Sequence, residues 1–252
     1  MADDFRAKYD ELKGIIKGLG TAFRYANLQI DLRSLYSVNL AYSSSGEDLW
    51  LRQFMKSVLR SGQPGFYVDL GCNEPIITSN TYLFYSYGWR GICIDVSPQF
   101  ADDFKALRPR DVVVHAAISD QNRPLYFATQ RAVAGHKTGR VTSSPDDFDL
   151  TYFPSIEVKS RTLADVLRAH VPAGQVIDFM SIDLEDSELP ALRSNDWAAY
   201  KPRVILIECG TGFDPLAPLN FPTIKFLADL GYKYEGYSCN NVLLTGPNFA
   251  SP

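Results

Sequence analysis

The chain has 252 residues, a formal net charge of −4 and a pI of about 5.4, with 46% hydrophobic and 21% charged residues. This length fits one large α/β domain with a modest extension, and the acidic balance argues against a nucleic-acid partner. No apolar run reaches the ~18 residues of a membrane span, and the N-terminus lacks a signal peptide's basic start. The four cysteines form no C-x-x-C pair, and Cys72, Cys93 and Cys209 lie at or beside predicted strands, which predicts buried free thiols and the cytosol as the compartment.

The first 41 residues are expected to form a helical extension, followed by one domain over residues 42–252. Apolar residues between Phe5 and Leu19 fall roughly on one helical face, although glycines weaken this helix. The helix could cover the edge of the domain or contact a partner subunit in a homodimer. Covering is the favoured interpretation.

A polar loop at Ser43–Asp48 precedes a helix that opens at Leu49. Serine before Glu47 and Asp48 is typical of a helix N-cap with acids in the first turn, and this interpretation is favoured. The functional alternative is that the loop, with Ser45 and Glu47, folds over a cofactor from outside the sheet.

Residues 65–95 have the pattern of the first half of a nucleotide-binding α/β unit. The apolar run Phe66–Val68 stops at Asp69 and Gly71, which predicts a buried strand that enters a tight turn. Such a turn lets the backbone approach a ligand closely.

The second strand of this unit is expected at Ile92–Ile94, and it ends at Asp95. Residues 81–87 have room for a connecting helix that Gly88 ends. An acid at the end of the second strand can accept hydrogen bonds from both hydroxyls of a ribose.

The glycine spacing narrows the choice of nucleotide. A dinucleotide site needs three glycines in G-x-G-x-x-G to hold a pyrophosphate, and only Gly71 is present here. The pattern Asp69-x-Gly71-x-Asn73 followed by an acid on the second strand is instead that of S-adenosylmethionine sites. An NAD-dependent enzyme is therefore disfavoured.

Further elements alternate along the chain. Strands are expected at 112–118, 125–127, 156–160, 176–182, 204–208, 232–237 and 241–244. Helices are expected after Pro98 with Phe100, Phe104 and Leu107 inward, after Thr162 as N-cap, from Leu189 to Trp197, and over 224–230 before Gly231. Residues 128–152 have no clear period and are predicted to form a long functional loop that contains His136.

Four predicted strands carry an acid at their carboxyl ends: Asp69, Asp95, Asp183 and Glu208. In open α/β sheets the ligand lies outside these ends. Like charges gathered there repel one another unless a ligand or cation uses them. A cationic sulfonium ligand with a ribose and an amino group would satisfy several of these acids.

Several segments together resemble the FkbM family of S-adenosylmethionine-dependent methyltransferases, in order from about Tyr42 to Leu244. They are Tyr42–Asp48, Phe66–Pro75, Gly88–Asp95, Ile177–Glu185 and Pro202–Glu208. The resemblance implies a Rossmann-like class I fold, with helices on both faces of a seven-stranded, mostly parallel sheet with one antiparallel strand. It also implies O-methylation of hydroxyls on sugars, glycolipids or polyketides.

The resemblance assigns roles by position. It implies that Asp69, Gly71 and Asn73 form the methionine-side loop and that Asp95 binds the ribose. The cofactor-binding residues it implies are Ser45, Glu47, Asp69, Gly71, Cys72, Asn73, Asp95, Val96, Ala117 and Asp183. The chain departs from the family pattern at two positions: the family commonly has lysine where Ser181 stands and glycine where Asp186 stands. These departures bear on the identity of the acceptor.

Catalysis would require alignment of an acceptor oxygen with the S–CH3 bond and removal of the hydroxyl proton. Asp183, Glu185 and His136 are the candidate bases, although a solvated residue is the favoured interpretation of His136. Mg²⁺ held by Asp183 with Glu208 or Glu185 could lower the pKa of the hydroxyl.

The sequence thus predicts an S-adenosylmethionine-dependent O-methyltransferase for a carbohydrate-like hydroxyl on a small molecule or oligosaccharide. Two alternatives stay open. One is a methyltransferase for a polyketide or another small natural product. The other is a non-catalytic module that binds the cofactor and serves interaction.

Overall fold

The computed structural model describes residues 39–252, except for 98–99, 122, 131–138, 150, 211–215, 248 and 250–252. Residues 41–252 belong to one compact unit. The helix expected between Phe5 and Leu19 lies outside the described residues, so the extension and the homodimer stay predictions. Among the described residues, no helix combines the length and apolar character needed to cross a membrane.

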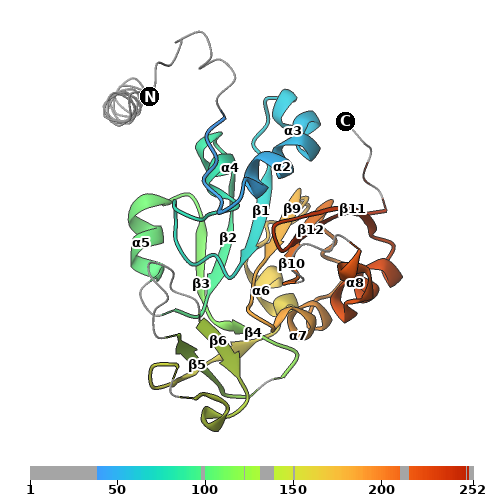
Figure 1. The fold of residues 1–252 in the computed structure, drawn as a ribbon. Helices are drawn as coiled ribbons and strands as arrows, with labels where there is room; N and C mark the ends of the chain where they lie inside the picture. Colours follow the sequence, from blue (N-terminus) through green and yellow to red (C-terminus); the bar gives the residue numbers. More distant parts are fainter. Residues whose placement is uncertain are drawn as a thin grey trace, which may run out of the picture. The chain divides into compact units, whose positions relative to one another are not determined.

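A seven-stranded sheet forms the centre of this unit, in the order β11-β12-β10-β9-β1-β2-β3 (Figure 1). Strand β12 is antiparallel to both of its neighbours, whereas the other strand pairs are parallel. The predicted sheet with one antiparallel strand is therefore confirmed. Its strands are β1 (Phe66–Leu70), β2 (Arg90–Asp95), β3 (Val112–His115), β9 (Phe179–Ile182), β10 (Val204–Glu208), β11 (Lys233–Ser238) and β12 (Asn241–Thr245).

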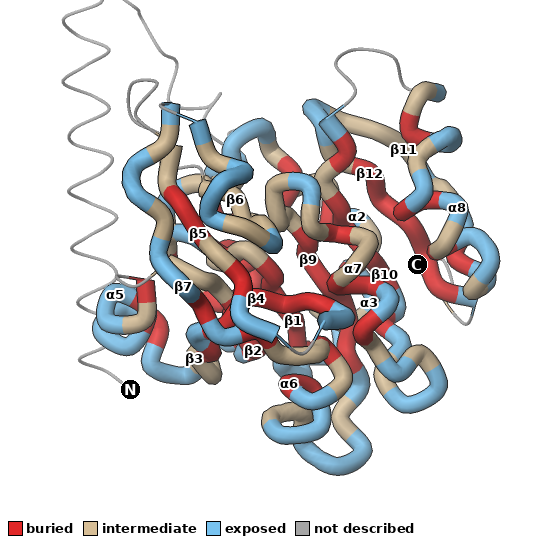
Figure 2. The backbone as a smooth tube through the Cα atoms, turned by 90° about the horizontal axis from the view of Figure 1, so that it is seen from below, coloured by how far each residue is buried: buried red, intermediate tan, exposed pale blue. Residues whose placement is uncertain are grey.

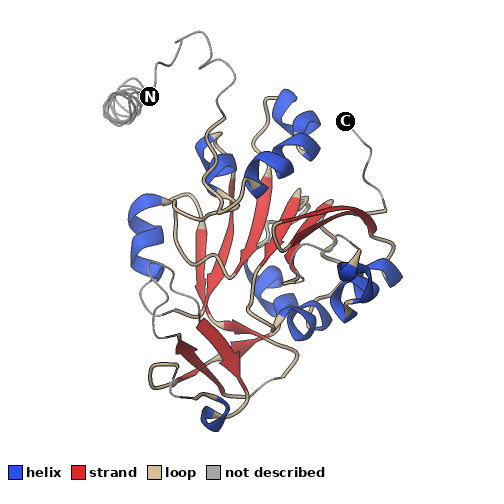
Figure 3. Cartoon of the chain, in the orientation of Figure 1, coloured by secondary structure: helices blue, strands red, loops and turns tan. Residues whose placement is uncertain are grey.

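Helices cover both faces of the sheet (Figure 3). Successive side chains of a strand point to opposite faces, so Tyr67 packs in one apolar cluster and Val68 in the other. The cluster around Tyr67 includes residues of α2 (Glu47–Phe54), α4 (Tyr82–Ser86) and α5 (Phe100–Leu107), and the cluster around Val68 includes residues of α6 (Leu163–His170), α7 (Glu188–Arg193) and α8 (Pro222–Asp229). Figure 2 shows the resulting buried strands between exposed helices and loops.

A smaller three-stranded sheet lies beyond the carboxyl ends of β1–β3 (Figure 1). Its order is β6-β5-β7, and all of its pairs are antiparallel. Its strands are β5 (Leu125–Thr129), β6 (Gly139–Thr142) and β7 (Ile156–Val158). The prediction of one structureless loop over 128–152 is therefore wrong, because β6 and a 3₁₀ turn at Pro145–Asp147 lie within it.

Two predicted strands are divided. The run 112–118 breaks at Ala116 into β3 and β4 (Ala117–Ile118), and the run 156–160 continues as β8 (Ser160–Arg161). Strands β4 and β8 pair in parallel as a separate two-stranded sheet. At this break the chain leaves the main sheet, and Ala117 packs in an apolar cluster with residues of β5 and β7.

Helix ends follow the predictions in part. The Thr162 hydroxyl accepts from the Asp165 N–H at 3.1 Å, which confirms the cap of α6. The N-cap of α2 is Gly46, with φ 89°, rather than a serine. Ser43 nevertheless accepts from the Asp48 N–H at 3.2 Å, since the loop folds back onto the first turn. A short helix, α3 (Lys56–Arg60), follows α2.

Helix α5 does not turn Leu107 inward, because that side chain is 50% exposed. The buried stripe runs through Phe100 and Phe104 to Arg108, which follow at intervals of four residues. Arg108 thus occupies the position of a core residue.

Candidate active site

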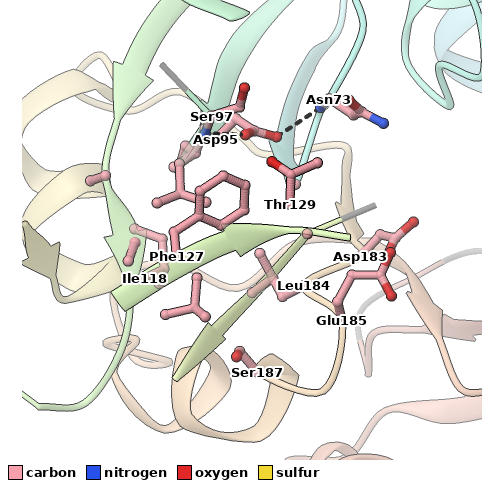
Figure 4. Close-up of a pocket in the computed structure, with 17 residues that line it drawn as sticks. Asn73, Asp95, Ser97, Ile118, Phe127, Thr129, Asp183, Leu184, Glu185 and Ser187 are labelled. Atoms are coloured by element: carbon pink, nitrogen blue, oxygen red, sulfur yellow. Dashed lines mark hydrogen bonds between the residues drawn. The ribbon is translucent and has the colours of Figure 1, made fainter. Parts of the chain in front are cut away.

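A pocket opens at the carboxyl ends of β1, β2 and β9, where residues of β5 and β6 form the facing wall (Figure 4). This is the edge at which open parallel sheets bind ligands. Asp95 and Asn73 lie on one side of the pocket, and Asp183 and Glu185 lie on the other. Its lining comprises Gly71, Asn73, Ile94, Asp95, Val96, Ser97, Ala116, Ala117, Ile118, Phe127, Thr129, Gly139, Val141, Asp183, Leu184, Glu185 and Ser187.

The structure brings most of the predicted site residues together. The lining includes Gly71, Asn73, Asp95, Val96, Ala117, Asp183 and Glu185. The lining does not include Ser45, Glu47, Asp69 or Cys72. His136 lies outside the described residues. The roles assigned to all of these residues stay predictions.

The sequence reasoning missed the wall formed by the smaller sheet. Phe127, Thr129, Gly139 and Val141 come from a segment mostly predicted as loop, and no local pattern indicates that it folds over the main sheet. Ser97, next to Val96, could have been found by proximity to the end of β2.

Asp95 is held rigidly at the end of β2. Its two carboxylate oxygens accept from the Ser97 N–H at 2.7 Å and from the Asn73 N–H at 2.9 Å. Burial raises the pKa of Asp95, and these backbone hydrogen bonds oppose the rise. Each carboxylate oxygen retains a second lone pair, so Asp95 can still accept hydrogen bonds from a ligand.

Gly71 allows β1 and β9 to converge at the pocket. Its φ is 78°, and a Cβ atom at this position would lie 1.7 Å from the carbonyl oxygen of Asp183. The Asp183 N–H in turn donates to the Leu70 carbonyl at 2.9 Å. Any larger residue at position 71 would therefore displace Asp183 from the pocket wall.

Four carboxylates, defined here as the acidic rim, follow β9 and end β10: Asp183, Glu185, Glu188 and Glu208. Burial and then the Glu208 charge hold the pKa of Asp183 well above its usual range. Burial and then the charges of Glu208 and Glu188 raise the pKa of Glu185 to about 7. Within the part of the chain that the structure describes, no arginine or lysine forms an ion pair with these four acids.

Glu185 stands where three cavities meet. It lines the main pocket, a cavity beside Glu208 and Phe221, and a small cavity beside Arg140 and Tyr152. Its φ of 51° lies in the left-handed region, as does that of Asp186 at 79°. Consecutive non-glycine residues in this region indicate backbone strain, which is concentrated at functional sites.

Asp69 takes a different position from Asp95. As the fourth residue of β1, it points to the same face as Tyr67 and pairs with Cys93, two residues before the end of β2, so it lies deeper than Asp95, next to α4 and α5. Its carboxylate accepts from the Thr81 hydroxyl at 2.6 Å. Burial raises the pKa of Asp69 to about 6, while Thr81 and Arg108 oppose the rise.

The described residues contain no group of three or more His, Cys, Asp or Glu side chains arranged to hold a metal ion. The predicted use of Mg²⁺ by Asp183 with Glu208 or Glu185 therefore finds no support among them and stays a prediction.

The order of the main sheet and the pocket at its carboxyl edge define a Rossmann-like class I methyltransferase fold. A family model described as the methyltransferase FkbM domain matches residues 69–234. The chain therefore belongs to the FkbM family of S-adenosylmethionine-dependent methyltransferases.

Two solved structures are similar to this chain at low identity. One is monomeric WbdD, with 13% identity and a TM-score of 0.44 over 86% of this chain and 44% of that chain. The chain thus spans less than half of the WbdD structure. The other is an O-methyltransferase from Bacillus cereus in complex with SAH, with 12% identity and a TM-score of 0.38 over 90% of this chain and 97% of that chain. A comparison with curated protein sequences gives no match.

Proposed function

We propose that this protein transfers a methyl group from S-adenosylmethionine to a hydroxyl of a sugar or glycan-like acceptor. The observation that carries the proposal is Glu185, a carboxylate with a pKa of about 7 at the junction of the cofactor pocket and two further cavities. A general base works best when its pKa lies near the operating pH.

The lining fits the chemistry of the cofactor. The carboxylate of Asp95 suits the ribose hydroxyls, and the apolar side chains of Val96, Ile118 and Phe127 suit the adenine ring. Asp183 and the acidic rim supply negative charge for the amino group and the sulfonium. When bound, S-adenosylmethionine supplies an electrophilic methyl group.

The chain's own contribution is to hold the acceptor and remove its proton. Glu185 would accept the proton of the acceptor hydroxyl as the oxygen loses it, and Asp183 would orient that oxygen. Burial, and then the charges of the neighbouring acids, keep the pKa of Glu185 high enough for this exchange at neutral pH. The apolar side chains of Phe127 and Val141 line one wall of the pocket, where they would help to exclude water from the reacting atoms.

The cavities beside Glu185 favour a polar acceptor over an apolar polyketide. One contains Glu188 and Glu208 near Phe221, and the other contains Arg140 near Tyr152. Carboxylates accept hydrogen bonds from hydroxyls, and aromatic rings can pack on the face of a sugar. The guanidinium of Arg140 adds a donor group to the lining of the cavity beside Tyr152.

Calorimetric titration with S-adenosylmethionine, alongside Asp95→Ala, tests the cofactor site. Micromolar binding that the variant abolishes supports the proposal, and a screen of sugar acceptors with methyl transfer as readout follows. Absence of binding by folded protein would overturn the cofactor assignment. Binding without transfer to any hydroxyl would favour the non-catalytic interaction module.

A further inference from the structure

We propose that Arg108 and Thr81 are positioning residues for the cofactor: they hold the loop between β1 and α4 from behind the sheet, in the geometry the pocket needs. This loop spans residues 71–81 and carries Gly71 and Asn73, which line the pocket. The part of the proposal that concerns ligand affinity rests on the proposed cofactor assignment. The part that concerns the loop itself does not.

Arg108 is fully buried and contacts the loop at three points. Its Nη1 donates to the Pro75 carbonyl at 3.2 Å and to the Ser79 hydroxyl at 3.3 Å. Its Nη2 donates to the Thr81 hydroxyl at 3.0 Å. The planar guanidinium can make several such bonds at once because its donors have fixed directions.

The remaining contacts fix Arg108 itself. Its Nε donates to Asp111 at 2.7 Å, and its Nη2 also donates to the Tyr67 hydroxyl at 2.8 Å. Both side chains of the Arg108–Asp111 pair have zero exposure. We call Tyr67, Asp69, Thr81, Arg108 and Asp111 the buried brace. A buried charge with all these partners holds one orientation, because any movement would leave it without compensation.

On its other side, the loop is fixed by the residues of the pocket. The Gly71 and Cys72 N–H groups donate to the Ile94 carbonyl, at 2.9 and 3.3 Å, and the Asn73 N–H donates to Asp95. The loop therefore lies between Asp95 and the buried brace. Loosening the brace should release Asn73 and hence the carboxylate of Asp95.

Thr81 is the best residue at which to test this, because its hydroxyl links Asp69 to Arg108. It donates to Asp69 at 2.6 Å and accepts from Arg108 at 3.0 Å. Thr81→Val removes the hydroxyl with little change in shape, and Thr81→Ser keeps it. Ser194→Ala is the matched control: this buried hydroxyl accepts from the Leu163 N–H at 2.9 Å and lies outside the pocket lining.

The first measurement is amide hydrogen exchange without ligand. We expect Thr81→Val to speed exchange at residues 71–80 by at least tenfold, Thr81→Ser to restore protection, and Ser194→Ala to leave this loop unchanged. Unchanged protection of the loop in Thr81→Val would overturn the proposal.

The second measurement is calorimetric titration with S-adenosylhomocysteine. We expect about tenfold weaker binding by Thr81→Val, as for loss of one buried hydrogen bond, with Thr81→Ser and Ser194→Ala close to the parent protein. Equal affinity of Thr81→Val and the parent would overturn the positioning role. If the parent itself does not bind, the proposed function fails, whereas faster loop exchange would still establish the brace.

Discussion

The buried brace and the acidic rim are two acid-containing clusters on one sheet, and they handle charge in opposite ways. In the brace, Arg108 pairs with Asp111 and is linked to Asp69 through the Thr81 hydroxyl, and its guanidinium also lies 4.8 Å from the ring centre of Phe104. In the rim, four carboxylates are gathered, and no arginine or lysine pairs with them among the described residues.

This difference suggests that the brace is structural and that the rim belongs to the active site. A compensated cluster fixes the backbone around it, whereas uncompensated like charges destabilise the folded chain until a cation or proton joins them. The loop at residues 71–81 connects the brace to the pocket. We therefore expect the brace to keep this loop rigid although the acids of the rim repel one another.

The largest expected effect concerns the base in the rim. Glu185→Gln should lower turnover by about 10²–10⁴-fold, because the amide cannot accept the acceptor's proton. In the parent protein, kcat/KM should rise as pH passes through about 7, since the carboxylate form is the active one. Initial rates of methyl transfer from pH 5 to 9 measure both effects.

Glu157→Gln provides the control, because Glu157 is exposed on β7 and outside the pocket lining. This variant should keep the rate and the pH profile of the parent. A Glu185→Gln enzyme that retained the step near pH 7 would assign the base to another residue.

The next largest effect is expected for a substitution that disrupts the brace. Arg108→Met should lower the free energy of unfolding by about 3–5 kcal/mol, because it leaves Asp111 buried without its partner. Urea denaturation monitored by circular dichroism measures the change. Arg168→Met removes an ion pair with Asp165 whose arginine side chain is 64% exposed, so its effect should stay below about 1 kcal/mol. Equal losses in the two variants would contradict the proposed difference.

Stability should also depend on pH through the rim. The pKa values of Asp183, Glu185 and Glu188 are raised in the folded state, so the folded chain binds more protons than the unfolded chain between about pH 4 and 7. Their contribution is present below the unfolded pKa values and is lost as pH rises through the folded ones. The Tm should therefore fall from pH 5 to 8, by a few degrees.

Ligand sharpens this test. S-adenosylmethionine carries positive charge, so it should raise Tm more at pH 8 than at pH 5 when added at saturating concentration. A parallel series with Asp183→Asn should show a smaller fall with pH. A Tm that rises steadily from pH 5 to 8 would show that the rim is compensated in solution.

Sequence patterns predict the main sheet well because its buried strands carry a local signal. Each apolar run that ends in an acid, such as Val204–Glu208, corresponds to a strand, with bounds that match in that case. Local patterns predict two strands of the smaller sheet, at 125–127 and 156–160, but they do not predict β6 or the pairing of the three strands, because β6 is half exposed and carries no clear alternation. Whether such a segment forms a strand depends on its tertiary contacts.

The same limit explains the acids of the site. Asp69 and Asp95 look equivalent in the sequence and alternate onto the same face of the sheet, yet Asp69 pairs with Cys93, two residues before the end of β2, whereas Asp95 ends that strand at the pocket. Asp69 is held by the Thr81 hydroxyl, which also accepts from Arg108. A buried arginine held by Asp111, by Tyr67 of β1 and by the loop at residues 71–81 is visible only once the chain has folded.

The smallest prediction compares one acid from each cluster. Glu208→Gln should raise the free energy of unfolding at pH 8 by about 1 kcal/mol, because the Glu208 charge repels Asp183 and Glu185. Asp111→Asn, the matched loss of one charge from the brace, should lower it, because Arg108 loses its counter-charge. At pH 5 the gain in Glu208→Gln should shrink, since Asp183 and Glu185, whose pKa values are raised, then bind protons and no longer repel the Glu208 charge. Opposite signs at pH 8 would establish that charge compensation distinguishes the two clusters, whereas losses in both variants would show that the rim, too, is held by attractive contacts.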